Sequence, residues 1–182
     1  NFSTVDGKPI LFNKDQTAFI LVLGLLQGDY VIPEGVVKIA SDAFAGQIGL
    51  TGITIPHSVK EIGDKAFTGC ASLTSVVFQH SEAEPSQLTT LGTNLFLNDA
   101  KLASVTLPDN LTVIPKYMFS GCEALTAVTL PSGLTEVGER SFYGTGLTSV
   151  TLPASVTTIG SYAFSGIGLN NFKKIKIPDS VT

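Results

Sequence analysis

The sequence predicts a β-rich solenoid: a right-handed coil of about six 23-residue units and one partial unit, with a β-hairpin cap at its N-terminal end. Three observations lead to this prediction. Pro and Phe recur at a constant spacing, a segment of β-rich composition precedes each of these prolines, and 18 Gly and 9 Pro among 182 residues are too many for a helical bundle. With 43% hydrophobic residues, the chain is also too apolar for disorder and can form a substantial core.

The repeat is most visible in its aromatic residues. Five prolines are each followed by a Phe eleven residues later, and a sixth unit, with Gln79 in the proline position, reaches its Phe after 17 residues. The six rings are Phe44, Phe67, Phe96, Phe119, Phe142 and Phe164, at spacings of 23, 29, 23, 23 and 22 residues. The long unit contains an insertion from His80 to Pro85. A partial unit, residues 175–182, stops before its own Phe, so we expect the native chain to continue.

Each unit predicts one coil. In the unit that begins at Leu125, alternating apolar residues over 125–130 indicate a short strand, and Pro131 ends it because proline lacks the N–H of the next ladder bond. The apolar pair and Gly within 134–138 indicate a second short extended or turn-like segment. Phe142 follows, and Gly144 provides a left-handed turn.

Stacked coils explain how the apolar residues are buried. Neighbouring strands lie about 4.8 Å apart, so equivalent side chains form continuous columns, and the Phe column is the strongest expected feature. Ile10–Phe12 and Phe19–Val22 flank a polar turn and predict a β-hairpin over the first coil. We therefore divide the chain into a capping segment, residues 1–29, and a repeat array, residues 30–182.

The repeat also carries a family resemblance. Its pattern, Leu-x-x-Val-x-Leu-Pro-x-x-Leu-x-x-Val-Gly-x-x-x-Phe-x-Gly-Cys, is seen best over 102–122 and 125–144 and resembles the BspA-like leucine-rich repeats of bacterial surface proteins. The resemblance covers roughly residues 30–182. It implies an extracellular or cell-surface protein that acts in adhesion or in recognition of host or neighbouring-cell proteins. Gln79 and Pro115, the latter in a Gly position, depart from the pattern, and we expect both to alter local loops without shifting the register.

Charge and hydropathy exclude two kinds of partner. A net charge of −4 and a pI near 5.0 give no electrostatic basis for binding nucleic acid. The longest apolar run, Ala18 to Leu26, is nine residues, whereas a membrane-spanning helix needs about 20. We expect neither a nucleic-acid partner nor a membrane span.

The residues capable of catalysis or metal binding are few and scattered. Cys70 and Cys122 occupy equivalent positions two coils apart, about 10 Å or more, which is too far for a disulfide, so buried free thiols are expected. His57 falls at a solvated coil corner, and His80 stands beside Glu82 and Glu84 in the insertion. Without a nucleophile motif or metal-ligand spacing, we expect no enzyme activity, no metal and no cofactor.

Tyrosines mark another side of the coil. Tyr117 and Tyr162 share the position two residues before the Phe, and Tyr143 follows a Phe directly. We expect these rings on the back of the coil, stacked against neighbours rather than forming a sugar platform.

The outward positions of the predicted strands form the candidate binding surface, which we call the strand face. Its residues are Thr74, Ser75, Val77, Ser104, Thr106, Thr126, Thr129, Thr148, Ser149, Thr151, Lys173, Lys174 and Lys176. Thr suits any exposed sheet, and three lysines on one strand also protect an edge against pairing, so either feature can be purely structural. As a continuous, hydroxyl-bearing surface that is uncharged until it ends in three lysines, it favours a protein partner. Two alternatives are a structural spacer for a neighbouring domain and a carbohydrate-binding module, although the strand face lacks aromatic residues.

Overall fold

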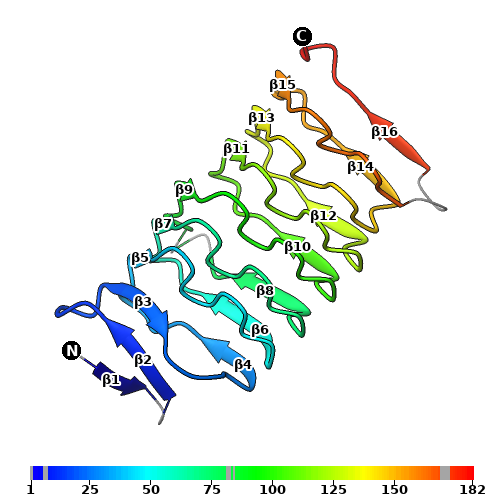
Figure 1. Ribbon diagram of the computed structural model, residues 1–182. Coiled ribbons are helices and arrows are strands. Elements are labelled where there is room, and N and C mark those ends of the chain that lie inside the picture. Colours follow the sequence, from blue (N-terminus) through cyan, green and yellow to red (C-terminus); the bar gives the residue numbers. More distant parts are fainter. Residues whose placement is uncertain (1, 6–7, 81–82, 84, 169–172) are drawn as a thin grey trace.

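The chain forms a solenoid of stacked coils with a β-hairpin at one end, as the repeat predicts (Figure 1). The computed structural model describes residues 2–5, 8–80, 83, 85–168 and 173–182, and within these ranges the chain contains no helix. The strand face is formed by β4 (Gly28–Val31), β6 (Leu50–Ile55), β8 (Ser75–Phe78), β10 (Ser104–Thr106), β12 (Ala127–Thr129), β14 (Ser149–Thr151) and β16 (Lys174–Lys176). Two-residue strands form a second face: β5 (Lys38–Ile39), β7 (Glu61–Ile62), β9 (Thr90–Leu91), β11 (Val113–Ile114), β13 (Glu136–Val137) and β15 (Thr158–Ile159).

The strand face pairs in parallel, one strand per coil. Gly52, Ser75, Ser104 and Ala127 lie opposite one another on successive strands, so the 23-residue repeat and the 29-residue unit share one register. The sheet β12-β10-β8-β6-β4 ends at β12, and β14 pairs only with β16. Our expectation of a continuous face is wrong at this point. The break falls where the connection from Phe142 to β14 is one residue shorter than in the preceding coil, the origin of the 22-residue spacing.

The second face is interrupted by a proline. In four coils a Gly N–H after the short strand donates to the preceding coil, as from Gly138 to Ile114 O at 2.8 Å and from Gly92 to Ile62 O at 2.7 Å. Pro115 has no N–H to donate. The sheet that contains β5, β7 and β9 accordingly ends at β9. A separate sheet of β11, β13 and β15 begins in the coil of Pro115. This proline therefore divides a sheet, a larger effect than the altered loop that we expected.

The glycines that follow the short strands of the second face lie close to the backbone of the preceding coil, which leads to a mutational prediction. A Cβ on Gly138 would lie 2.7 Å from both Ile114 O and Lys116 N, which are main-chain atoms that cannot move aside. We expect Gly138→Ala to lower the free energy of unfolding by about 1–3 kcal/mol, measured by urea denaturation. Gly133 is the matched control, because its Cβ would meet no atom within 4 Å. Gly133→Ala should be neutral or slightly stabilising, and equal losses in both variants would contradict this explanation.

A third side, which we call the turn face, is built around the repeated Phe. Two residues before each Phe the backbone is left-handed, with φ between 50° and 59°, and two residues after it φ is 63° to 76°. The later position holds Gly in five coils and Asn98 in the sixth, as the Gly pattern predicts. The earlier position holds no Gly, so its left-handed conformation was not predicted. These turns stack through backbone hydrogen bonds between coils, such as Phe119 N to Ser141 O at 2.8 Å.

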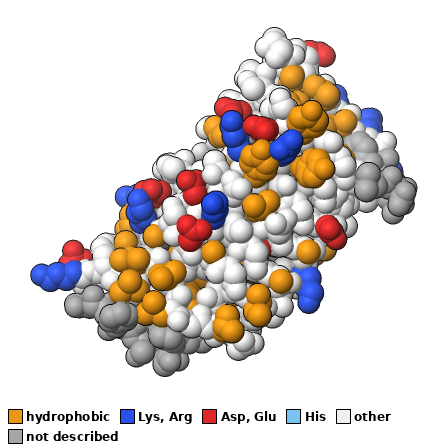
Figure 2. Space-filling model, in the orientation of Figure 1, with side chains coloured by type: hydrophobic (Ala, Val, Ile, Leu, Met, Phe, Trp, Pro, Cys, Tyr) orange, Lys and Arg blue, Asp and Glu red, His pale blue; other side chains and the backbone are white. Residues whose placement is uncertain are grey.

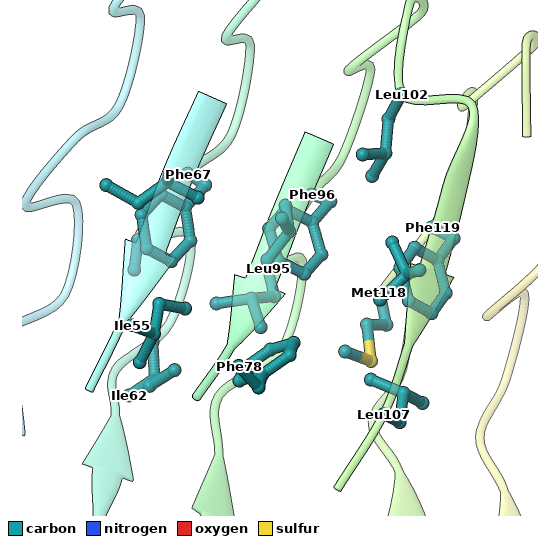
Figure 3. Close-up of a cluster of buried hydrophobic side chains, with 14 of the residues drawn as sticks. Ile55, Ile62, Phe67, Phe78, Leu95, Phe96, Leu102, Leu107, Met118 and Phe119 are labelled. Carbon is teal, nitrogen blue, oxygen red and sulfur yellow. The ribbon is translucent and has the colours of Figure 1, made fainter. Parts of the chain in front are cut away.

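The Phe column is the centre of the core. Rings stack from Phe19 through the six repeat rings to Phe164, with centroids 4.5 to 5.6 Å apart and planes within 21° of parallel. Figure 3 shows Phe67, Phe96 and Phe119 in a row, with aliphatic side chains such as Ile55, Ile62 and Leu107 beside them. The predicted column is confirmed, and it extends one ring into the capping segment.

The cap is the predicted hairpin with one additional strand. β2 (Lys8–Phe12) pairs antiparallel with β3 (Ala18–Val22), β1 (Phe2–Val5) pairs antiparallel with β2, and β3 pairs in parallel with β5. Gln47 of the first coil fixes the segment between β3 and β4. Its Oε1 accepts from Leu26 N and its Nε2 donates to Gly24 O, both at 2.8 Å. The boundary at residue 29 remains a prediction, since β4 spans it.

The insertion leaves the register intact, as expected, because the chain on both sides is fixed to the preceding coil. Gln79 has an N–H where other units have proline, and it donates to Ile55 O at 2.8 Å. Gln87 N donates to His57 O at 3.0 Å. On the other side, Asn110 Nδ2 of the next coil donates to Leu88 O at 2.5 Å. The longer unit therefore does not displace the stack.

Candidate functional site

The structure exposes nearly every residue that we assigned to the strand face. Side chains alternate along each strand, so that in β10 Val105 is buried while Ser104 and Thr106 are exposed. Thr74, Ser75, Val77, Thr126, Thr129, Ser149, Thr151 and the three lysines are exposed as well, and Thr148 is half-buried. The β12–β14 break separates the positions on β8, β10 and β12 from those on β14 and β16. The candidate surface thus consists of a central hydroxyl-bearing part and a terminal part with the lysines.

Several hydroxyls on the strand face make no hydrogen bond to a neighbouring coil, unlike hydroxyls that fix one coil to the next. At the entrance to the second face hydroxyls bind the preceding coil, as when Thr135 Oγ1 donates to Thr112 O at 3.0 Å and Ser155 Oγ donates to Leu134 O at 2.6 Å. On the strand face itself, Thr51 Oγ1 donates to Asp29 Oδ1 at 2.6 Å and Thr74 Oγ1 donates to Thr51 O at 2.9 Å. Within the described part of the chain, no such bond holds the hydroxyls of Ser104, Thr106, Thr126, Thr129, Ser149 or Thr151. These six remain available to a binding partner.

The strand face is hollowed beside the insertion. Two adjoining hollows of about 290 and 320 Å³ share His80 and Thr106 as lining residues. One extends over Ser75, Val77 and Ser104, and the other extends past Pro85 toward Asn110 and Thr129. Val77 is 51% exposed and provides apolar surface in the first hollow. A protruding side chain of a partner can be accommodated beside His80.

The two histidines are not brought together with other catalytic groups in the described residues. His80 is exposed, and Glu82 and Glu84, which we considered with it, lie outside the described residues. His57 is half-buried rather than fully solvated as expected, with its Nδ1 3.7 Å from Glu34 Oε2. The described ranges contain no group of three His, Cys, Asp or Glu residues that could hold a metal ion.

A buried acid was missed by the sequence analysis. Asp99 takes the position of Cys70 and Cys122, three residues after the Phe, and is fully buried. Its Oδ1 accepts the Cys70 N–H at 2.7 Å, whereas Oδ2 has no hydrogen-bond partner. Burial raises the pKa of this carboxyl to about 8. The signal was present in the repeat, because aligning the units puts Asp99 in a column otherwise expected to be buried.

Both cysteines are free and buried, as predicted. Cys70 Sγ lies 3.2 Å from Phe44 O and Cys122 Sγ lies 3.1 Å from Phe96 O, so each thiol donates to the preceding coil. Burial, together with the nearby Asp99 carboxyl, raises the pKa of Cys70 to about 12. We expect a thiol-specific reagent to modify neither cysteine in the native protein and both in denaturant. A thiol that reacts rapidly in the native state would contradict this placement.

Aromatic and charged side chains form a cluster on the turn face, which we call the turn-face cluster: Lys116, Tyr117, Glu139, Arg140 and Tyr162. The Arg140 Cζ lies 5.8 Å from the Tyr117 ring centroid and 5.1 Å from that of Tyr162, and its Nη1 donates to Tyr117 Oη at 3.1 Å. Tyr117 Oη in turn donates to Glu139 Oε1 at 3.1 Å, and Lys116 Nζ lies 3.6 Å from Glu139 Oε2. The expected packing of Tyr117 and Tyr162 against neighbours is confirmed, with Arg140 as the shared neighbour.

Comparison with known proteins agrees with this architecture. The profile of the BspA type leucine rich repeat region matches residues 27–88 and 89–182 in six copies. The chain belongs to this family. No curated protein matches this BspA-type repeat chain.

Solved structures of bacterial proteins share the fold. A leucine rich cell surface protein from Faecalibacterium prausnitzii A2-165 is 30% identical with a TM-score of 0.67, and the match covers 96% of this chain and 54% of that one. The T. pallidum leucine rich repeat protein is 26% identical with a TM-score of 0.56, covering 98% and 72%. A leucine-rich repeat protein from Eubacterium ventriosum is 24% identical with a TM-score of 0.67, and the match covers 100% of this chain and 52% of that one. At this identity the similarity shows the fold alone. The BspA-type chain thus spans about half the length of the first and third of these proteins. Among its described residues, no helix reaches the length and apolar character of a membrane span.

Proposed function

We propose that this chain is a non-catalytic recognition module of a secreted or cell-surface protein and that it binds a protein partner through the strand face. The observation that carries the proposal is the set of exposed hydroxyls on β10, β12 and β14 that make no hydrogen bond within the described chain. Side chains that stabilise the array elsewhere are used in inter-coil hydrogen bonds, whereas these are not. Their regular spacing suits a broad, complementary interface.

The hollows beside His80 support the same proposal. Protein interfaces concentrate their binding energy where an anchor side chain fills a desolvated recess, while surrounding polar contacts contribute shape. Val77 and Pro85 provide apolar surface in these hollows, and Ser104 and Thr106 provide hydroxyls. The extracellular location is supported by the similarity to a protein described as a cell surface protein.

Substitution of the strand face tests this proposal. Thr106 and Thr129 lie opposite each other on β10 and β12, so Thr106→Arg combined with Thr129→Arg places two bulky charges at the centre of the surface. Against purified bacterial and host surface proteins, we expect the affinity for any bound protein to fall at least tenfold, about 1.4 kcal/mol. Thr158→Arg, an exposed position on β15 of the second face, is the control and should bind normally.

Two results would contradict recognition through the strand face. Unchanged affinity of the folded double variant would place the contact elsewhere. If the wild-type chain binds no protein and the activity of the longer protein depends only on the number of coils, tested by deleting one 23-residue unit, the chain is a spacer.

A further inference from the structure

The turn face carries side chains at a conformational cost that packing alone does not require. The left-handed position before each Phe holds Asp42, Lys65, Asn94, Tyr117, Arg140 and Tyr162 in successive coils. Asp and Asn tolerate this conformation, whereas bulky residues adopt it rarely and at an energetic cost. Three consecutive coils nevertheless place Tyr, Arg and Tyr there. Such positions are a reason to look for function.

The chemistry of this cluster is that of an interaction hot spot. Tyr and Arg are enriched among the residues that dominate interface energies, whereas Ser, Thr and Val, which form most of the strand face, are under-represented. Tyr162 is 62% exposed, and Tyr143 in the neighbouring turn is 44% exposed. Figure 2 shows hydrophobic, basic and acidic side chains close together toward the C-terminal half of the array, and a second group of basic and acidic side chains nearer the N-terminal half.

The cluster is already ordered before a partner arrives. Arg140 lies between the rings of Tyr117 and Tyr162 and donates a hydrogen bond to Tyr117. Fixing these long side chains in advance lowers the entropy lost on binding. Arg140 has five N–H donors, of which the bond to Tyr117 uses one, so its planar fork can still bind a carboxylate in a bidentate manner.

Charge identifies the kind of partner. Lys116 and Arg140 outnumber the single carboxylate of Glu139, so the cluster is locally positive in a chain of net charge −4. An extended polyanion would be repelled by the chain as a whole, but an isolated carboxylate would not. A sugar would need a free aromatic face, and Arg140 already covers one face of Tyr117 and of Tyr162. These observations favour protein carboxylates over a glycan.

We infer that the turn-face cluster is a second interaction surface, separate from the strand face, which binds a protein segment that presents Asp or Glu side chains beside apolar residues. Arg140 receives the carboxylate, and the exposed Tyr162 ring packs against the adjacent apolar side chain. This site is independent of the proposed strand-face function, since the two lie on different sides of the coil.

The test uses random dodecapeptides displayed on phage and selected on the whole chain. Enriched peptides should share Asp or Glu next to an apolar residue, and their affinity should fall at least tenfold in Arg140→Gln and in Tyr162→Ala. Arg140→Lys keeps the charge but not the planar fork and should show a clear, smaller loss. Thr158→Arg, at an exposed position on β15 of the second face, should bind normally, and thermal unfolding verifies that each variant is folded.

Each of the following outcomes would overturn the inference. Selected peptides could lack acidic residues or fail to be enriched at all. Acidic peptides could bind Arg140→Gln as tightly as wild type, or lose affinity in Thr158→Arg instead. Finally, in place of any acidic peptide, heparin or a sialylated glycan could bind in an Arg140-dependent manner, which would identify an anionic glycan as the partner class.

Discussion

Replacing Phe119 with Ala should lower the free energy of unfolding by about 3–5 kcal/mol. The ring is fully buried and stacks on Phe96 at 5.6 Å and on Phe142 at 5.4 Å. Its removal loses burial and two aromatic contacts and leaves a cavity that the neighbouring coils cannot fill, since each coil is fixed to the next by backbone hydrogen bonds. Urea denaturation followed by circular dichroism measures the loss.

The end of the column provides the control for Phe119. Phe164 is only partly buried, and its ring stacks on Phe142 at 5.3 Å. Phe164→Ala should therefore cost clearly less than Phe119→Ala. Equal costs, or a loss below about 1 kcal/mol at Phe119, would show that the column is not the centre of stability.

The second large effect is a dependence of stability on pH that arises from Asp99. Its pKa is about 8 in the folded chain and near its ordinary value of 3.8 in the unfolded chain. Between these values the folded state keeps a proton that the unfolded state has lost, so stability falls as pH rises. The contribution is fully present below about pH 4 and is lost as pH rises through about 8. One such proton gives a slope of about 1.4 kcal/mol per pH unit between the two values.

Neutral substitution isolates this effect. Asp99→Asn keeps the shape and cannot ionise, so its stability should not show this slope, and it should exceed that of wild type at pH 8. Asp109→Asn, at an exposed acid in the next coil, should leave the slope in place. A wild-type stability that is flat or rises from pH 5 to pH 8, measured by urea denaturation at each pH, would contradict an ionisable buried Asp99.

Most of the fold could be predicted from the periodicity of the sequence, because each coil repeats the same few constraints. The spacing of Pro, Phe and Gly, with the alternation of apolar residues, was sufficient to place the strands of the array, the Phe column and the exposed strand-face positions, and two apolar runs around a polar turn placed the capping hairpin. The two sheet breaks depended on finer causes: a single missing N–H at Pro115 and a connection shortened by one residue before β14. A 23-residue pattern averages over such differences, so they were not predicted.

Sites on the turn face were harder to predict than the strand face. The left-handed position before each Phe holds Tyr or Arg as well as Asp and Asn, so composition gives no signal of its conformation. The Arg140 contacts join residues 22 and 23 positions apart, and they become visible only once the coils are stacked. Asp99 was missed for a different reason. It occupies the same repeat position as Cys70 and Cys122, but an acidic residue is not expected to be buried there.

Recognition through the strand face is tested most directly by hydrogen–deuterium exchange of the chain alone and in complex with a protein that it binds. We expect slower exchange in the complex for the segments that contain β8, β10 and β12, together with Ser86 and Asn110 beside the hollows, and no change in the second face. Protection confined to β11, β13 and β15, or absent from β10 and β12, would contradict the proposal.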